Sequence, residues 1–418
     1  ADAFTTHPDP RHVSRIISAL NDTNSKTPLL RHTLRIALRN QLRDEKTLSR
    51  LTKRTLKQTD RDAIADVAIA IRSPASADFL IDYLSTGTHR SQTIRRFAEH
   101  IAQHADLTAL GRLPQVVKAA FANDLNQQLS ILEAVETGSN QREGNTSPAI
   151  QEWGIELAEK LLLKVDQAGA TWIHRAVPGT AATKLPWIIQ PRRSADGDNQ
   201  SLFLCSLSPG GEQYTGVIRS PSFLLPDKFS FYLAGHDGYP EKSAQGRNQV
   251  RLRLDKTGEI LASAAPPRND TAQRVTWNLT QYAGKEAFLE VIDSDDAGAY
   301  AWLAIGRFSA PLVTLPKLSP QYRSHLLTAA ARIAASLPES SLYQKMTKTV
   351  SNPTIPALTR SEIATALCRP HPDPLTRAIA RRLADGTLTE TMSQSIGAQL
   401  FTSDIAAKIP SLVENLFQ

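Results

Sequence analysis

The stretch QVRLRLDKTGEILASA at residues 249–264 decides how the middle of this chain folds. Apolar and polar residues alternate in QVRLRL before a central DKTGE turn, which places the apolar ones on one face of that strand, and the apolar run ILASA follows the turn. Similar runs surround this stretch. We predict eight strands, at residues 201–207, 215–219, 229–235, 249–255, 259–264, 274–279, 287–292 and 301–308. Short strands joined by turns in this number indicate an antiparallel β-sandwich of the jelly-roll type.

Helical spacing replaces this alternation on both sides of the predicted sandwich. Val13, Ile16, Ile17 and Leu20 recur at the spacing of one helix face. The pairs Asp9-Pro10, Ser73-Pro74 and Asp373-Pro374 each put a side-chain acceptor at an N-cap and proline at the first helical position. The tetrapeptide His-Pro-Asp-Pro occurs at residues 7–10 and again at 371–374. Short capped helices of this kind predict an α-solenoid that resembles HEAT repeats.

These patterns divide the chain into three parts and give a multidomain fold of α and β regions. We predict a HEAT-like helical repeat region at residues 1–165, a β-sandwich with its leading segment at 166–312, and a helical region at 319–418. The polar segment 138–148 is typical of a linker. The first residues, ADAF, contain no initiator methionine and no signal peptide, so we expect a processed chain or an excised fragment.

Composition excludes several classes of function. The 418 residues contain two cysteines, Cys205 and Cys368, which rules out a disulfide scaffold and a CxxCH haem attachment site. The net charge of +7 is spread thinly, except in residues 31–61, where ten basic residues face three acidic ones. No aromatic residues interleave with that run, so we expect a solvated surface and no nucleic-acid partner. No stretch is apolar for long enough to predict a membrane span.

Strand direction places three polar loops at one end of the predicted sandwich. If successive strands run antiparallel, residues 236–248, 266–271 and 293–300 meet there, opposite the turns at 256–258 and 283–284. We call these three segments the rim loops. Their candidate ligand-binding residues are His236, Asp237, Asn248, Arg268, Asn269, Asp270 and Tyr300. Their candidate metal ligands are Asp293, Asp295 and Asp296.

Three interpretations of the rim loops remain open. The polar groups satisfy the loop backbone, or they bind carbohydrate with Tyr239, Tyr300 or Trp302 as a stacking platform, or the three aspartates hold calcium. An EF-hand does not fit, because its fifth and twelfth positions fall on Ala297 and Ala304.

Two expectations are specific to single residues. Within the rim loops we expect Asp270 to be structural and Arg268 to be exposed. We also expect Trp277 to be a core residue and no sugar platform, since Val275, Trp277 and Leu279 alternate with polar neighbours.

Motifs of catalysis are missing from the sequence. It contains no GxSxG, HExxH, Walker or GxGxxG pattern, so we expect no enzyme. A glycan-active hydrolase with paired carboxylates on the rim is the enzymatic alternative.

Four motifs of the middle region resemble a known family. TGVIRSP at 215–221, AGHDG at 234–238, PPRNDTAQ at 266–273 and YAWLAIGR at 300–307 are similar to the galactose-binding-like sandwich of large secreted haem-binding proteins of the PVC bacterial group. In those proteins a propeller, HEAT-like helices, this sandwich and a c-type cytochrome domain share one chain. The propeller and CxxCH are absent from these 418 residues, so neither haem nor dehydrogenase activity is implied for them.

Together, pattern and resemblance predict a non-catalytic binding and spacing module of a periplasmic or extracellular protein. The expected partner is a carbohydrate, and we expect no cofactor apart from the calcium alternative. The other prediction is a protein-interaction scaffold that docks an electron-transfer or dehydrogenase partner, or other domains of the same polypeptide.

Overall fold

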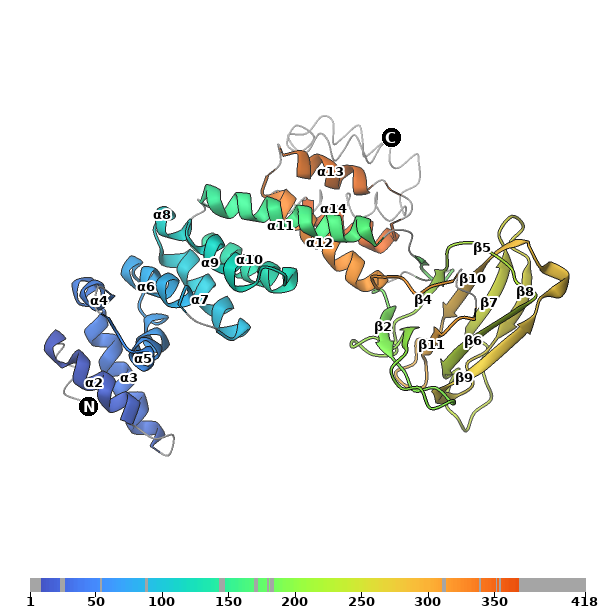
Figure 1. Cartoon of the computed structure of the whole chain (residues 1–418), viewed down its shortest axis with the longest axis horizontal. Helices are drawn as coiled ribbons and strands as arrows, with labels where there is room; N and C mark the ends of the chain where they lie inside the picture. The colour runs from blue at the N-terminus through green and yellow to red at the C-terminus, as the bar shows by residue number, and fades with distance from the viewer. Residues whose placement is uncertain are drawn as a thin grey trace. The chain divides into compact units, whose positions relative to one another are not determined.

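The computed structural model describes residues 9–22, 27–52, 55–86, 89–142, 147–168, 172–178, 180, 184–309, 313–337, 340–350, 352 and 355–367. The chain forms two compact units, Ala1–Leu157 and Ala158–Gln418. The described part of the first unit is helical, and that of the second contains two β-sheets and further helices (Figure 1). The predicted combination of α and β regions is therefore confirmed. The boundary between the units falls inside one helix, α11 (Pro148–Gln167).

The helices of the first unit follow one another closely. They are η1 (Pro10–His12), α2 (Val13–Asp22), α3 (Pro28–Leu42), α4 (Glu45–Thr52), α5 (Gln58–Ala68), α6 (Pro74–Leu84), α7 (Ser91–His104), α8 (Leu107–Leu110), α9 (Leu113–Ala120) and α10 (Leu125–Asn140). The four apolar residues that predict α2 are all buried. Ser73 caps α6 as expected, because its side chain accepts a hydrogen bond from the Ser76 amide. The second His-Pro-Asp-Pro copy lies outside the described residues, and the repeat period stays a prediction.

The predicted linker differs from the structure at its first residues. Gly138 and Ser139 lie in the last turn of α10 and are buried, where a loop was expected. A Cβ atom on Gly138 would overlap the carbonyl oxygen of Glu99 in α7 and lie 2.9 Å from the Cβ of Ala102. Glycine at this position therefore allows two helices to approach closely. Sequence composition does not distinguish such a glycine from one in a loop.

The second unit contains two antiparallel sheets. One has the strand order β1 (Ile173–Arg175), β4 (Gly216–Arg219), β10 (Glu286–Asp293), β7 (Asn248–Leu254), β8 (Ile260–Ala264), and β5 (Phe223–Leu224) also pairs with β10. The other has the order β2 (Ile188–Pro191), β3 (Leu202–Cys205), β11 (Leu303–Gly306), β6 (Lys228–Gly235), β9 (Asn269–Asn278). All eight predicted strands are present. The strands that the sequence did not predict are β1, β2 and β5, which have two to four residues each.

Alternation along the strands builds one core between the sheets and a second cluster outside them. Phe229, Phe231 and Leu233 of β6 pack into the core with residues of both sheets, such as Val250 and Leu289. On the outer face of the five-stranded sheet a smaller cluster contains Phe203, Cys205, Ala234, Ala272, Trp302 and Ala304. Both faces of this sheet are therefore apolar in part, and the outer one carries the site described below.

Trp277 lies on the core side of β9, as predicted. Its ring packs edge-on against Phe231, with 4.8 Å between the ring centroids, and tilted against Phe229. The side chain is half-buried, because β9 is the edge strand of its sheet. The expected face is confirmed, and the burial is less complete than a central strand would give.

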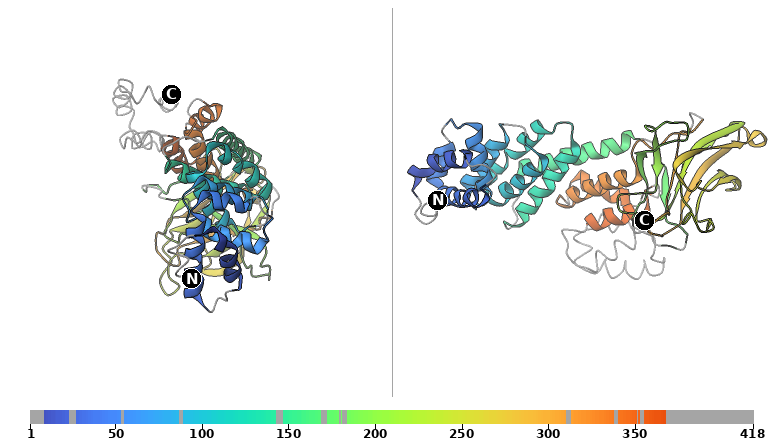
Figure 2. Two further views of the ribbon diagram at one scale, coloured as in Figure 1. Left: turned by 90° about the vertical axis from the view of Figure 1, so that its left-hand side faces the viewer. Right: turned by 90° about the horizontal axis from the view of Figure 1, so that it is seen from below.

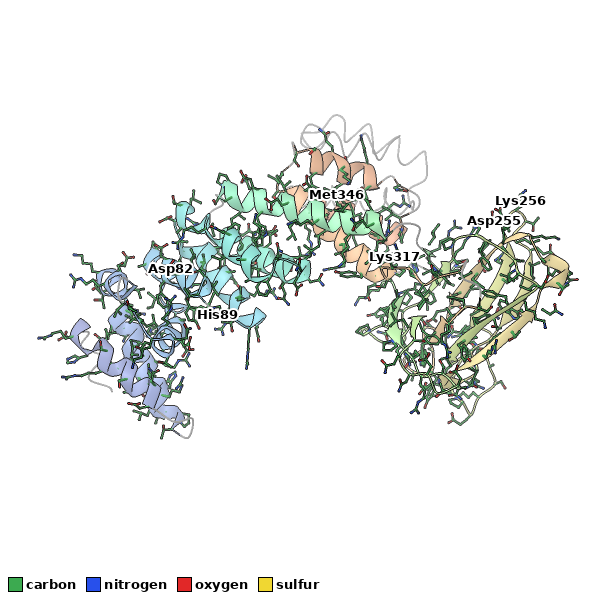
Figure 3. All side chains as sticks on the ribbon, in the orientation of Figure 1. Asp82, His89, Asp255, Lys256, Lys317 and Met346 are labelled. Atoms are coloured by element: carbon green, nitrogen blue, oxygen red, sulfur yellow. The ribbon has the colours of Figure 1, made fainter. Side chains whose placement is uncertain are left out.

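Three more helices follow the sandwich in the same unit: α12 (Pro320–Ala335), α13 (Ser341–Val350) and α14 (Ala357–Leu367). They pack beside the last turns of α11 (Figures 1 and 2). Two hydrogen bonds join α11 to α12: Lys164 Nζ donates to the Tyr322 hydroxyl over 3.2 Å, and Arg323 Nη1 donates to the Val165 carbonyl over 3.3 Å. Met346 of α13, labelled in Figure 3, is fully buried.

The contact at Gly138 leads to a prediction about stability. On an open helix face, replacing glycine by alanine stabilises by up to about 1 kcal/mol. We expect Gly138→Ala to destabilise the chain by about 2 kcal/mol, because the new methyl group displaces the α7 backbone. Urea unfolding followed by circular dichroism measures this. Gly298→Ala is the control, since nothing lies within 4 Å of a Cβ at that residue. A Gly138→Ala protein as stable as wild type would contradict the close contact.

Candidate functional site

The three rim loops meet at one end of the sandwich, as strand parity predicts. Arg247 Nη1 lies 3.3 Å from Asp295 Oδ1, and the Ser294 amide donates to Asn248 Oδ1 over 3.1 Å. His236 Nε2 lies 3.1 Å from Asp270 Oδ1, which joins the first loop to the second. Asp255 and Lys256 follow β7 at the opposite end (Figure 3).

Asp237 and Asn248 hold the first rim loop together. The Asp237 carboxylate is 1% exposed and accepts hydrogen bonds from the amides of Gly246, Arg247 and Asn248, over 2.5, 2.9 and 3.1 Å. Asn248 is fully buried, and its side-chain amide donates to the His236 carbonyl over 3.0 Å. The hydrogen-bonding groups of these two candidate ligand residues are thus directed at the backbone.

Arg268 and Asp270 have the reverse of their expected roles. Arg268 is half-buried with φ +57°, and its Nη2 donates to the carbonyl oxygens of Gly238 and Tyr239. The Asp270 side chain is 79% exposed. The reason is that β9 begins at Asn269, so Asp270 shares the outer face with Ala272 two residues later. Asn269 is exposed, and its side chain accepts from the Thr271 amide.

The candidate metal ligands lie in different environments. Asp293 and Asp295 are buried, whereas the Asp296 side chain is 80% exposed. Arg247 pairs with both Asp295 and Asp296. Within the described ranges no three His, Cys, Asp or Glu side chains form a group that could hold a metal ion. Calcium binding here stays a prediction.

Asp293 is a buried acid beside other acids. Burial raises the pKa of Asp293 well above its usual value, and the nearby carboxylates of Asp295 and Glu212 raise it further. A hydrogen bond from Ser206 and the Asp295 amide oppose this rise. The folded chain therefore binds a proton at Asp293 that the unfolded chain releases.

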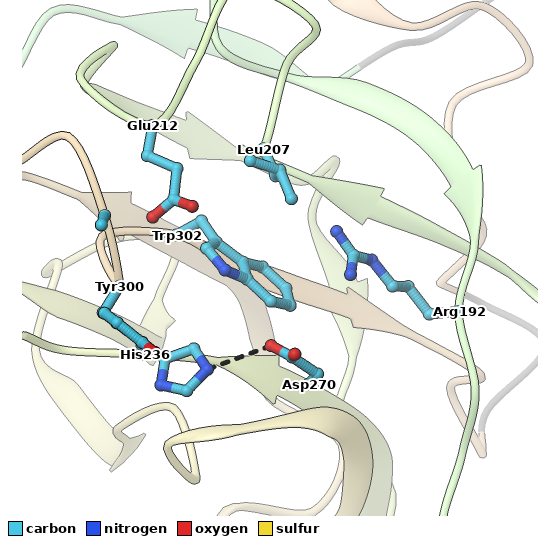
Figure 4. A pocket seen from close by; sticks show the side chains of 8 residues that line it. Arg192, Leu207, Glu212, His236, Asp270, Tyr300 and Trp302 are labelled. Atoms are coloured by element: carbon cyan, nitrogen blue, oxygen red, sulfur yellow. Dashed lines mark hydrogen bonds and ion pairs between the residues drawn. The ribbon is translucent and has the colours of Figure 1, made fainter. Parts of the chain in front are cut away.

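A pocket of about 380 Å³ opens on the outer face of the five-stranded sheet, beside the rim loops (Figure 4). We call it the Trp302 pocket. Its lining residues are Arg192, Leu207, Glu212, His236, Asp270, Ala299, Tyr300 and Trp302. Three of the candidate ligand-binding residues, His236, Asp270 and Tyr300, meet in it.

Trp302 forms the wall of this pocket and holds Arg192. The Trp302 ring is 4% exposed, and the Arg192 guanidinium carbon lies 4.1 Å from its centroid. Arg192 Nη2 lies 3.5 Å from Cys205 Sγ, a weak acceptor. Arg192 Nε is buried and has no hydrogen-bond partner. Because Arg192 covers its ring, Trp302 is no stacking platform for a ligand.

Each of two carboxylates in the Trp302 pocket contacts a partner within the protein through one of its oxygens. Glu212 Oε2 accepts from the Ala301 amide over 2.8 Å, and Asp270 Oδ1 pairs with His236. Across the described residues no hydrogen bond reaches their second oxygens, so each can accept one from a ligand. His236 Nδ1 is buried without a partner.

Exposed aromatic surface comes from Tyr300 and Tyr239. Tyr300 is 39% exposed, Tyr239 is 41% exposed, and their ring centroids are 5.2 Å apart. Tyr300 has φ +56°, a backbone conformation that residues other than glycine rarely adopt. Its ring also meets His236 edge-on, with 4.9 Å between centroids.

Sequence reasoning missed Arg192 and Glu212. Arg192 directly follows β2, a strand that the sequence did not predict, and Glu212 follows the turn at Ser208–Gly211. Neither belongs to a motif, so no signal in the sequence marks them.

The hydrogen bonds of Asp237 predict that two rim aspartates, Asp237 and Asp270, contribute very differently to stability. Asp237→Ala removes the acceptor of three backbone amides and should destabilise the chain by about 3 kcal/mol. Asp270→Asn should change stability by less than about 1 kcal/mol, because the Asp270 side chain is largely in solvent. Urea denaturation followed by tryptophan fluorescence compares them. Equal losses in both variants would show that the roles are wrongly assigned.

The raised pKa of Asp293 predicts a pH-dependent stability. Its ordinary value is 3.8, and the folded chain keeps the proton to higher pH, so stability should fall as pH rises above about 4 until the folded pKa is passed. Asn imitates the protonated acid. Asp293→Asn should therefore be more stable than wild type, by a margin that grows as the pH rises above about 4. Unfolding free energies from urea titrations test this, and a margin independent of pH would contradict it.

Comparison with known proteins does not identify the chain. No family model matches it, and no curated protein matches it. The C-terminal extracellular domain of EmbC from Mycobacterium tuberculosis, a crystal structure, is similar to 38% of this chain over 73% of that domain, with 15% identity and a TM-score of 0.21. At that score the similarity supports no conclusion about fold or ligand. Within the described part of the chain, no helix has the length and apolar character needed to cross a membrane.

Proposed function

We propose that this chain is a non-catalytic carbohydrate-binding module and that the Trp302 pocket is its binding site. The observation that carries the proposal is the set of groups around that pocket: an exposed tyrosine ring next to two carboxylates, an arginine and a histidine. Its volume of about 380 Å³ lies within the range of small-ligand sites.

Sugar hydroxyls match the unused capacity of these side chains. A hydroxyl both donates and accepts, so it can bind a carboxylate oxygen on one side and a cationic donor on the other. Glu212 and Asp270 each offer a second oxygen, and Arg192 offers donors. The exposed ring of Tyr300 can cover the apolar C–H face of a sugar. A purely apolar ligand would leave these polar groups unpaired.

The same arrangement favours binding over catalysis. In this region burial raises the pKa of Asp293, which would suit a general acid. However, Asp293 is fully buried and does not line the Trp302 pocket, so it cannot reach a bound sugar. Glu212 and Asp270 are positioned by an amide and by His236 as hydrogen-bond acceptors.

The resemblance to the galactose-binding-like sandwich supports the same assignment. Its motifs at 234–238, 266–273 and 300–307 supply His236, Asp270 and Trp302 with the adjoining Tyr300 to the pocket. In keeping with that resemblance, we propose that the chain is a module of a multidomain protein that works in the periplasm or outside the cell. Its helices then space the sugar-binding module from other domains or partners.

A glycan array probed with the full chain tests the proposal. We expect binding to a defined set of glycans, and an affinity roughly tenfold lower in Asp270→Asn, because a charged acceptor is lost. Asp296→Asn is the matched control: its side chain is 80% exposed, on the same rim, and outside the Trp302 pocket. No binding to any glycan would refute the proposal and favour the protein-interaction scaffold. Equal losses in both variants would move the site away from the pocket.

A further inference from the structure

We propose that the ligand of the Trp302 pocket is an acidic sugar whose carboxylate, as in a uronic acid, pairs with Arg192. This inference rests on the proposed carbohydrate binding and names the class of sugar. The observation behind it is a cation in the pocket that pairs with no carboxylate among the described residues, although two carboxylates line the same pocket.

Arg192 is left with unused donors. Its guanidinium contacts the Trp302 ring and, through Nη2, the sulfur of Cys205, which accepts hydrogen bonds weakly. Nε is buried without a partner, and within the described ranges Nη1 has none either. A buried donor without a partner destabilises the folded chain, and here the cost falls on a charged group. An anion from outside the chain would remove that cost.

The geometry of Arg192 suits a carboxylate in particular. The ring of Trp302 is buried, and the Arg192 guanidinium carbon lies over it, 4.1 Å from its centroid, so the ring contact restricts the guanidinium before any ligand arrives. A planar guanidinium presents paired N–H donors that match the two oxygens of a carboxylate. A single neutral hydroxyl would satisfy one donor and leave the charge uncompensated.

Glu212 and Asp270 do not exclude a negative ligand, because each has a partner within the protein. Asp270 pairs with His236, and Glu212 accepts from the Ala301 amide. Figure 4 shows Arg192 reaching Trp302 from one side and Glu212 lying on the other. A uronic acid provides partners for both kinds of group in the pocket. Its carboxylate faces the arginine, and its hydroxyls face the two acids.

The experiment compares charged and uncharged forms of one sugar. The probes are trisaccharides of galacturonic acid and of glucuronic acid, each with its methyl ester, which keeps the ring and the hydroxyls and removes the charge. Calorimetric titration of the full chain at 150 mM salt limits non-specific attraction to a protein of net charge +7. We expect at least one acid to bind roughly tenfold more tightly than its ester.

Variants then assign the effect to one side chain. Arg192→Gln should abolish this preference, because it weakens acid binding more than ester binding. Arg192→Lys should recover part of the preference, because it restores the charge without the planar donors. Arg193→Gln is the matched control: it removes the same charge from the next residue, which is exposed and outside the pocket. Melting temperatures verify that all variants fold.

Each outcome decides between the two proposals. If neutral sugars bind and the acids bind no better than their esters, the acidic-sugar inference is wrong and carbohydrate binding stands. If Arg193→Gln weakens acid binding as much as Arg192→Gln, the preference is a general charge effect and the inference fails. If neither these probes nor any array glycan binds, both proposals fail together.

Discussion

The three hydrogen bonds that the Asp237 carboxylate accepts from residues 246–248 set the arrangement of the whole rim. They close the loop between β6 and β7 on itself, so that the loop backbone becomes a fixed surface. Arg268 of the second rim loop then binds the carbonyl oxygens of Gly238 and Tyr239 on that surface. Asn248 joins the third loop through the Ser294 amide. A buried carboxylate is tolerated because its charge is shared among several amide donors.

The five-stranded sheet has apolar residues on both faces, and this gives the chain room for a pocket. Its inner face packs into the core, while its outer face holds the small cluster around Trp302. A sheet with a polar outer face would leave that surface to water. Here the segment after β2 covers part of the outer face. The Ala272 amide donates to the Arg193 carbonyl, and the Ala195 amide donates to the Ala272 carbonyl, so β9 holds this segment in place. Arg192 is thereby brought over Trp302.

Alternation and β-rich composition were sufficient to predict eight of the strands and, through their directions, the meeting of the rim loops. They did not predict β1, β2 and β5, because the residues of these strands, IHR, IIQP and FL, show no alternation of apolar and polar side chains. The same limit explains why Arg192, at the end of β2, was missed. The reversal of Arg268 and Asp270 has another cause. β9 begins earlier than its apolar pattern shows, at Asn269, so Asp270 obeys the alternation of a strand that appeared to be a loop.

Some buried polar groups at this rim have partners within the protein, and others have none. Asp237, Asn248 and Arg268 have partners within the loops, as a rigid frame requires. Arg192 Nε and His236 Nδ1, of residues in the Trp302 pocket, are buried without partners, as are Arg268 Nε, Asp293 Oδ2 and Asp295 Oδ2 on the rim outside the pocket. Folding alone would favour side chains without such a cost. The position of Arg192 and His236 beside the spare oxygens of Glu212 and Asp270 is explained if a ligand supplies the missing partners.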